Sequence, residues 1–368
     1  MHNAIRKDKF EISELRGLPS GYYILRKQGS YLQSRGLLET LTITDIPLHA
    51  ESSSLTFFHP EAMKFFECGD IAFVSPKGVL RVVLSKLANH NTLLVTERCD
   101  NLCLFCSQPP KDNDDSWLLS QAAMAAIEFD SNESLGISGG EPLIYGQSFI
   151  KFLDTLIDYK CDKSLHILSN GRKFSDTKFT LELAKRRKDI DLTFGIPLYS
   201  SVPHIHDMLV GSIGAFRDTM QGLINAGNAG IKIELRIIPT KENIDTLSQT
   251  VELVSRSISN VVQFSIMNME ATGWARKNWK QLYIDPIKYA EELEKSVLVA
   301  HSAGLPAFLF NYPLCHIKAE LEPLALKSIS DWKNFYPEEC SDCSKKYQCS
   351  GFFTSSKGIF HEAPRRIV

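Results

Sequence analysis

Three cysteines within eight residues constrain this chain more than any other feature of its sequence. Cys99, Cys103 and Cys106 stand at a C-x3-C-x2-C spacing, directly after the β-branched apolar run 92–96, which predicts a strand. Thiolates packed this closely bind zinc or an iron–sulfur cluster far more often than they fill a core. A structural zinc site takes four protein ligands, and no fourth Cys or His follows within the loop, since His90 precedes the strand. Three sulfurs therefore favour an iron–sulfur cluster with one iron open to a ligand from outside the protein.

The same loop resembles a known family. Its spacing, with the aromatic Phe105 just before the last cysteine, is similar to the cluster loop of the radical S-adenosylmethionine (SAM) enzymes. In that family three thiolates hold a [4Fe-4S] cluster, and the open iron binds the amino and carboxylate groups of SAM. Reduction then splits an S–C bond of SAM to give a 5′-deoxyadenosyl radical. The resemblance implies that Phe105 borders the adenine.

Strands alternate with helices of ten or more residues from residue 92 to about residue 304, a pattern typical of parallel βαβ units in an α/β fold. The expected strands are 92–96, 135–138, 164–169, 192–196, 231–238 and 261–267, and the expected helices are 120–129, 148–159, 175–187, 213–226, 247–257 and 286–303. Six strand–helix repeats fit the partial (β/α)6, TIM-like barrel that the resemblance implies. Sites in such sheets lie at the carboxyl ends of the strands.

Paired glycines follow the second expected strand, in the run Gly139, Gly140, Glu141 and Pro142. Glycines let a backbone approach a ligand without a Cβ in the way. The run matches the GGEP motif that holds the SAM amino group in the family. Asn170 follows the third expected strand, where the family places polar contacts to the ribose or carboxylate of SAM, although an Asn-Gly pair is also an ordinary turn.

The fourth and fifth strands supply further candidates. Ser200 ends the fourth at the position where family members contact SAM, and His204 and His206 follow in an expected loop, more as solvated or substrate-contacting side chains than as metal ligands. Arg236 lies on the fifth strand and needs an anion, because its guanidinium stays charged. The resemblance implies the SAM carboxylate, but strand alternation also puts Glu234 on the same face, so both partners remain open.

Four more cysteines gather in the last sixty residues: Cys315, Cys340, Cys343 and Cys349. The C-x2-C-x5-C spacing of the last three resembles the SPASM and shorter twitch regions of peptide-modifying radical SAM enzymes, which implies a second, auxiliary [4Fe-4S] cluster. Four cysteines are also a tetrahedral zinc set. Because the chain already carries the three-cysteine loop, an iron–sulfur cluster is favoured, and zinc stays open.

Composition limits the partners and the compartment. The chain carries 41 Lys and Arg against 43 Asp and Glu, which gives no net charge for nucleic acid or a membrane surface. With no apolar signal segment and no run of about 18 apolar residues, we expect a cytoplasmic protein. We expect three parts: an α+β accessory region at 1–90 with strands at 21–25, 71–74 and 80–84, the barrel at 91–310, and a cluster region at 311–368. The accessory region could cover a barrel edge or grip a peptide by strand addition.

Flanking phrases at 96–110, 269–275 and 328–334 resemble the radical SAM maturases of the His-Xaa-Ser system (HxsC type). That resemblance implies a ribosomally made precursor peptide as substrate, a paired second radical SAM protein, and an electron donor such as flavodoxin or ferredoxin. No general acid or base can be chosen from the sequence. A radical SAM enzyme for a small molecule, or a zinc-binding module without catalysis, are the alternatives.

Overall fold

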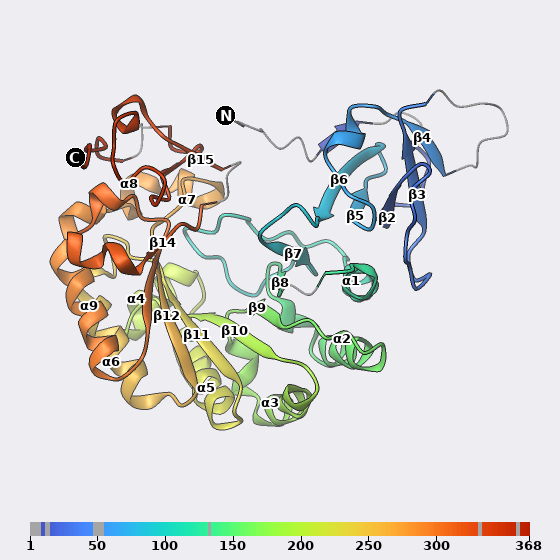
Figure 1. Ribbon diagram of the computed structural model, residues 1–368. Coiled ribbons are helices and arrows are strands. Elements are labelled where there is room, and N and C mark those ends of the chain that lie inside the picture. The colour runs from blue at the N-terminus through green and yellow to red at the C-terminus, as the bar shows by residue number, and fades with distance from the viewer. Residues whose placement is uncertain (1–8, 12–14, 47–54, 132–133, 330–332, 358–360) are drawn as a thin grey trace. The chain divides into compact units, whose positions relative to one another are not determined.

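The computed structural model describes residues 9–11, 15–46, 55–131, 134–329, 333–357 and 361–368. The chain divides into two compact units (Figure 1). The first comprises Met1–Glu97, Asn113–Leu168 and Arg186–Leu192, and the second comprises Arg98–Asp112, Ser169–Lys185 and Thr193–Val368. The expected division at residues 90 and 310 stays a prediction.

The first unit begins with a mixed six-stranded sheet in the order β1-β6-β5-β2-β3-β4. Its strands are β1 (Lys9–Glu11), β2 (Gly21–Lys27), β3 (Thr40–Thr44), β4 (Thr56–Phe58), β5 (Ile71–Val74) and β6 (Val79–Leu84). Alternate residues of β2 and β3, among them Leu25, Leu41 and Ile43, are fully buried in one core with Phe66. The three strands expected in this region are thus confirmed.

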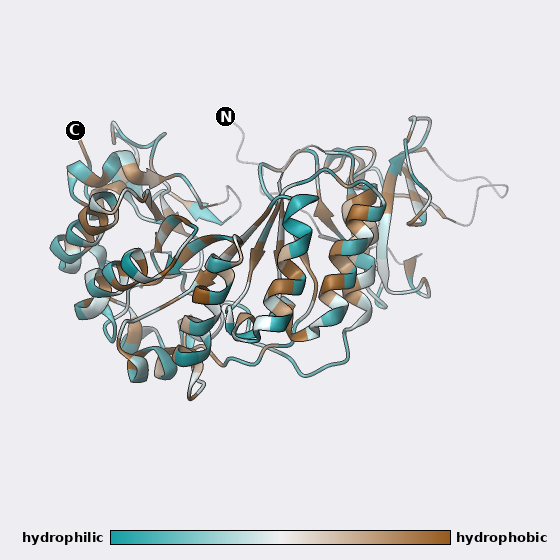
Figure 2. Cartoon of the chain, turned by 90° about the horizontal axis from the view of Figure 1, so that it is seen from below, coloured by the Kyte–Doolittle hydropathy of each residue, from teal (hydrophilic) through white to brown (hydrophobic). Residues whose placement is uncertain are grey.

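Three parallel strands and two helices complete the first unit: β7 (Asn91–Leu94), β8 (Leu135–Ser138), β9 (Leu165–Leu168), α1 (Trp117–Glu128) and α2 (Gln147–Asp158). Helix α2 buries Phe149, Phe152, Leu153 and Leu156, a spacing that puts them on one helical face. Figure 2 shows such helices with one hydrophobic side and one hydrophilic side. Hydrophobic burial along one stripe therefore positions them.

The second unit contains five parallel strands, of which β10 has its first residue in the first unit. The strands are β10 (Leu192–Pro197), β11 (Lys232–Ile237), β12 (Val261–Met267), β13 (Ala307–Phe310) and β14 (Ala325–Leu326), and a small antiparallel pair joins β15 (Asn334–Phe335) to β16 (Phe352–Phe353). The helices are α3 (Thr177–Ala184), α4 (Pro203–Val210), α5 (Ala215–Asn228), α6 (Leu247–Ser257), α7 (Gly273–Lys277), α8 (Trp279–Leu282) and α9 (Ala290–Ser302). Helices α6 and α9 pack against each other.

The parallel α/β architecture confirms the predicted fold class, and β8, β12 and α6 have the predicted bounds. The partial barrel and an auxiliary cluster region stay predictions. Strands β13 and β14 extend the set beyond the six expected, and α4 stands where a loop was expected. In the part of the chain that the structure describes, no helix has both the length and the hydropathy needed to cross a membrane.

Candidate functional site

The run of three cysteines lies in the second unit, where backbone hydrogen bonds hold it on two sides. On one side, the N–H groups of Leu102 and Leu104 donate to the carbonyls of Val210 and Leu209, at 2.8 and 2.9 Å. These carbonyls end α4, where the helix leaves its last carbonyls without partners of its own. The cysteine run therefore satisfies the end of α4, and α4 in turn fixes the run.

On the other side the run packs against the start of α7. The N–H of Trp274 donates to the carbonyl of Cys106 at 2.8 Å, and the Asn278 side chain donates to the carbonyl of Leu104 at 2.7 Å. Gly273 has a φ of +54°, and a Cβ there would lie 2.4 Å from the Cys106 oxygen. Glycine is thus required both by its backbone conformation and by this close approach.

The thiol of Cys103 is influenced electrostatically by the other two cysteines of the run. Burial raises the pKa of Cys103 most, and Cys99 and Cys106 raise it further. The N–H of Asn101 donates to the sulfur of Cys99 at 3.4 Å, a contact that stabilises a thiolate ligand. No three His, Cys, Asp or Glu side chains among the described residues already form a metal-binding group. The chemistry of the donors, rather than a preformed geometry, fits an iron–sulfur cluster.

An aromatic stack backs the cysteine run. Phe105 is buried and meets Tyr199 edge to face, with ring centroids 4.7 Å apart. Tyr199 donates its backbone N–H to Nδ1 of His206 at 3.2 Å and stacks on that imidazole. Burial lowers the pKa of His206 to about 4. The expectation that His206 is solvated is wrong, because α4 turns this side chain into the core, while His204 is exposed; a contact of either histidine with substrate stays a prediction.

Asn170, the turn residue predicted as a SAM contact, is tied to the cysteine run. Its Nδ2 donates to Asp100 at 2.6 Å, and its Oδ1 accepts the N–H of Arg172 at 3.0 Å. Arg172 in turn donates to the carbonyl of Asp100 and the side chain of Asn101, at 3.1 and 2.9 Å. The structure therefore brings the turn after the third expected strand to the cysteine run. The side chains that join them, Asp100 and Arg172, were not singled out from the sequence.

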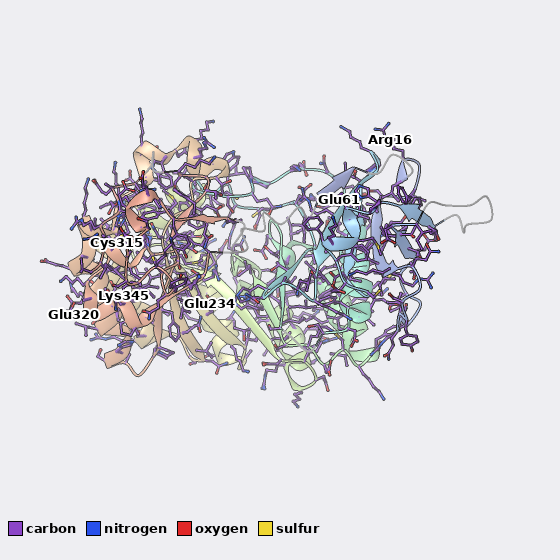
Figure 3. The ribbon with its side chains drawn as sticks, turned by 45° about the horizontal axis from the view of Figure 1, so that its top comes forward. Arg16, Glu61, Glu234, Cys315, Glu320 and Lys345 are labelled. Atoms are coloured by element: carbon purple, nitrogen blue, oxygen red, sulfur yellow. The ribbon has the colours of Figure 1, made fainter. Side chains whose placement is uncertain are left out.

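Ser200 and Arg236 both have partners within the protein. Ser200 is fully buried, lies 2.8 Å from the hydroxyl of Thr246, and accepts the N–H of Val202 at 3.0 Å. Arg236 donates to both carboxylate oxygens of Glu234, at 3.1 and 3.2 Å; Figure 3 labels Glu234. The internal pair is thus present, and contacts of Ser200 and Arg236 with SAM stay predictions.

The glycine pair lies in the first unit, against the end of the β7 segment. The N–H of Gly140 donates to the carbonyl of Thr96 at 2.9 Å, and a Cβ on Gly139 would lie 2.5 Å from the same oxygen. Glu141 is buried and accepts the N–H of Leu143 at 2.9 Å. Glu141 thereby caps the 3₁₀ turn Pro142–Tyr145. The carboxylate of the motif therefore stabilises the backbone turn that follows the two glycines.

The four C-terminal cysteines all lie in the second unit; Figure 3 labels Cys315. The pKa of Cys340 is raised to about 11 by burial and by the neighbouring thiols of Cys315, Cys349 and Cys343. The sulfur of Cys349 accepts two backbone N–H groups, each at 3.3 Å. Backbone donors to sulfur suit a metal-bound thiolate. The four donors fit a second cluster or a tetrahedral zinc equally well.

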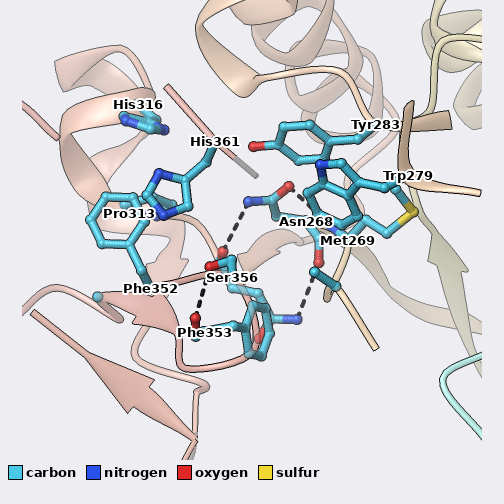
Figure 4. Close-up of a pocket in the computed structure, with 13 residues that line it drawn as sticks. Asn268, Met269, Trp279, Tyr283, Pro313, His316, Phe352, Phe353, Ser356 and His361 are labelled. Atoms are coloured by element: carbon cyan, nitrogen blue, oxygen red, sulfur yellow. Dashed lines mark hydrogen bonds between the residues drawn. The ribbon is translucent and has the colours of Figure 1, made fainter. Parts of the chain in front are cut away.

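A narrow cavity of about 20 Å³ opens near the carboxyl ends of β12 and β13 (Figure 4). Stacked aromatic pairs line it: Trp279 with Tyr283, centroids 4.1 Å apart, and Phe352 with His361, 4.3 Å apart. It is also lined by Met269, which packs in the hydrophobic cluster around Phe105, and by Gly351, whose N–H bonds to Cys349. Its wall therefore connects the surroundings of both cysteine sets.

The sequence interpretation missed three polar residues. Asp100 and Arg172 bond with the Asn170 turn and the cysteine run, and Asp115 bonds with Thr96 and Tyr145. Arg172 follows the predicted Asn-Gly turn, so its place beside a strand end was a usable signal. Asp115 stands in an acidic loop with Asp112 and Asp114, and no spacing distinguishes it from them. Only its hydrogen bonds with Thr96, Glu97 and Tyr145 in the folded structure distinguish Asp115 from the other two.

Comparisons with known proteins find relatives for a part of the chain. The family model described as the Radical SAM superfamily matches residues 93–254. An Fe-coproporphyrin III synthase of Methanosarcina barkeri is 30% identical over 169 residues, which are 44% of this chain and 39% of that protein. The sporulation killing factor maturation protein SkfB of Bacillus subtilis is 23% identical over 202 residues, 53% of this chain and 46% of that protein.

The chain thus spans less than half the length of these two curated relatives. Among solved structures, Streptococcus suis SuiB bound to S-adenosylmethionine is similar with a TM-score of 0.45 and 16% identity, over 60% of this chain and 51% of that chain.

Proposed function

We propose that this chain, a radical SAM enzyme by its domain at residues 93–254, modifies a ribosomally made peptide. The observation that carries the proposal is the loop of Cys99, Cys103 and Cys106, whose backbone is held by α4 on one side and α7 on the other. Three thiols at this close sequence spacing suit a cluster with an open iron.

The cysteine loop, its aromatic support and the glycine pair of the first unit each have a distinct role in this proposal. A [4Fe-4S] cluster held by the three thiolates would supply the electron that splits SAM into methionine and the 5′-deoxyadenosyl radical. Phe105, supported by Tyr199, provides an apolar wall that excludes water from the reacting atoms. Gly139 and Gly140 offer backbone groups to the SAM amino group. The protein's main contribution is to hold the radical carbon close to the target C–H bond.

A peptide substrate is supported by two observations. SkfB, one of the relatives, is named for the maturation of the sporulation killing factor. The second observation is an open cleft of about 310 Å³, lined by Leu314 and Gln348, the sequence neighbours of Cys315 and Cys349, and by the ion pair of Lys345 with Glu322, whose charged atoms are 2.7 Å apart. Figure 3 labels Lys345.

We propose a precursor of the His-Xaa-Ser type, a paired second radical SAM protein and a flavodoxin or ferredoxin as electron donor.

A small molecule is the second candidate substrate. The similarity to an Fe-coproporphyrin III synthase favours it, since that name describes chemistry on a small molecule. The narrow, aromatic-lined cavity beside Met269 would then belong to the binding site. We rank the small molecule second, because a shared radical SAM domain would account for this similarity and would leave the four C-terminal cysteines without a role.

The experiment is anaerobic reconstitution followed by a SAM cleavage assay. The reduced protein should release 5′-deoxyadenosine from SAM. A precursor peptide of the His-Xaa-Ser type should change in mass when it is co-expressed with the protein. Cys103→Ser serves as the matched control. Unchanged 5′-deoxyadenosine yield in that variant would exclude the assignment, and a colourless protein with about two zinc ions would instead favour a zinc-binding module.

A further inference from the structure

Asp115 is a buried carboxylate in the first unit that collects three hydrogen-bond donors from two segments. It accepts the hydroxyl of Thr96 at 3.0 Å and the backbone N–H of Glu97 at 2.5 Å. It also accepts the hydroxyl of Tyr145, the last residue of the 3₁₀ turn that follows the glycine pair. One side chain therefore joins the residues before the cysteine run to the end of the GGEP segment.

The peptide group between Thr96 and Glu97 is central to this arrangement. Its N–H points to Asp115, and its C=O accepts the N–H of Gly140 at 2.9 Å. Hydrogen bonds in such a chain polarise and orient one another. Because Gly139 also lies against this carbonyl, so closely that a Cβ would come within 2.5 Å of it, any rotation of the peptide group would move the glycine pair.

The arrangement requires a carboxylate at this position. An ionised Asp has two oxygens that only accept, so it can serve several donors at once, whereas Asn presents one acceptor and one N–H₂ group. In an Asp115→Asn variant the N–H₂ group would face a hydroxyl or a backbone N–H, and at least one buried donor would lose its partner.

We propose that Asp115 is a positioning residue that holds the Gly139–Gly140 backbone in the conformation that receives the amino group of SAM. It acts through the Thr96–Glu97 peptide group on one side and through Tyr145 on the other. The inference rests on the proposed function, since it assigns a SAM-binding role to the glycine pair.

Amide hydrogen exchange tests the positioning directly, without turnover. In Asp115→Asn, exchange at the Gly140 amide should accelerate about tenfold, as expected for the loss of a charge-assisted hydrogen bond. The dissociation constant of SAM for the reconstituted protein should rise by about the same factor, while the iron content stays that of the wild type. Unchanged exchange at Gly140, or unchanged SAM affinity, would overturn the proposal.

A merely structural role predicts a different result. It would accelerate exchange across β8 as a whole and lower the unfolding midpoint, with the SAM affinity of the folded fraction unchanged, and this outcome also overturns the proposal. Asp154→Asn is the matched control, because Asp154 is bonded to Arg186 in the same unit at 2.8 Å through each oxygen. It should leave both the Gly140 exchange and the SAM affinity within about twofold of the wild type.

Tyr145→Phe keeps the proposal testable if Asp115→Asn does not fold. It removes one donor and leaves the carboxylate, so it should weaken SAM binding about threefold. In the double variant the two effects should not add, because both residues act through one contact; full additivity would overturn the proposal. If the wild-type protein itself binds no SAM, the proposed function fails, and the exchange at Gly140 still decides whether Asp115 holds the glycine pair.

Discussion

At the scale of single residues, Arg236 shows how a buried ion pair can be separated from a ligand contact. The side chains of Arg236 and Glu234 are 22% and 4% exposed. Arg236→Ala would leave the carboxylate of Glu234 buried without its cation, which costs about 3 kcal/mol of folding stability. We expect a lower urea midpoint for this variant, whatever Arg236 does for SAM.

The double variant Arg236→Ala with Glu234→Gln provides the control. Neutralising the carboxylate removes the buried charge that the arginine had balanced, so most of the lost stability should return. SAM affinity is then measured in this stable protein. A weakened affinity supports the SAM carboxylate as a second partner of Arg236, whereas a normal affinity leaves the arginine a purely structural role.

His206 gives the chain a pH-dependent stability. Burial lowers its pKa from 6.5 to about 4, so the unfolded chain binds this proton at a higher pH than the folded chain does. Stability should therefore fall as the pH drops from about 6.5 towards 4, with a contribution of about 1 kcal/mol between pH 7.5 and pH 5.5. Urea unfolding of the wild type and of His206→Gln measures it. The variant should show the weaker pH dependence, and equal slopes would contradict the burial of a neutral imidazole.

At the scale of elements, the start of α7 is what most tightly fixes the cysteine run. Gly273→Ala would place a methyl group 2.4 Å from the Cys106 oxygen and force alanine into a left-handed conformation, at a cost of about 2 kcal/mol or more. We expect a lower unfolding midpoint and less bound iron. Gly304→Ala is the control, because its φ is +74° but a Cβ there has no neighbour within 4 Å. Equal losses in the two variants would show that the contact with Cys106 contributes nothing.

The elements also show what could be predicted from the sequence. Long periodic segments such as α6 and β12 were predicted correctly, because their apolar residues recur at the period of a helix or a strand. Helices α7 and α8 are five and four residues long, too short for a periodic signal. The cysteine spacing predicts the first site, since its chemistry is local in sequence. Asp115 and Arg172 could not be found in that way, because their partners are up to 72 residues away.

At the scale of the whole molecule, the two cysteine sets divide the proposed chemistry into a cleaving part and an accessory part. The first set lies on the loop that α4 and α7 hold, and the sulfur of Cys349 is held by the N–H groups of Leu314 and Gly351. Each set has its own backbone donors and its own supporting segments. Loss of one set should therefore leave the other able to bind its metal.

Cys349→Ser tests this independence. The variant should lose about four irons, the content of one cluster, and still release 5′-deoxyadenosine from SAM in the absence of peptide. Modification of the precursor should fall, because the accessory set no longer supports the substrate or accepts its electron. Iron analysis, 5′-deoxyadenosine yield and the mass of the precursor are measured together, with Cys161→Ser as the control, since Cys161 is buried in the first unit away from both sets in sequence. A variant with full iron content would refute Cys349 as a ligand, and loss of both clusters would show that the two sets fold as one.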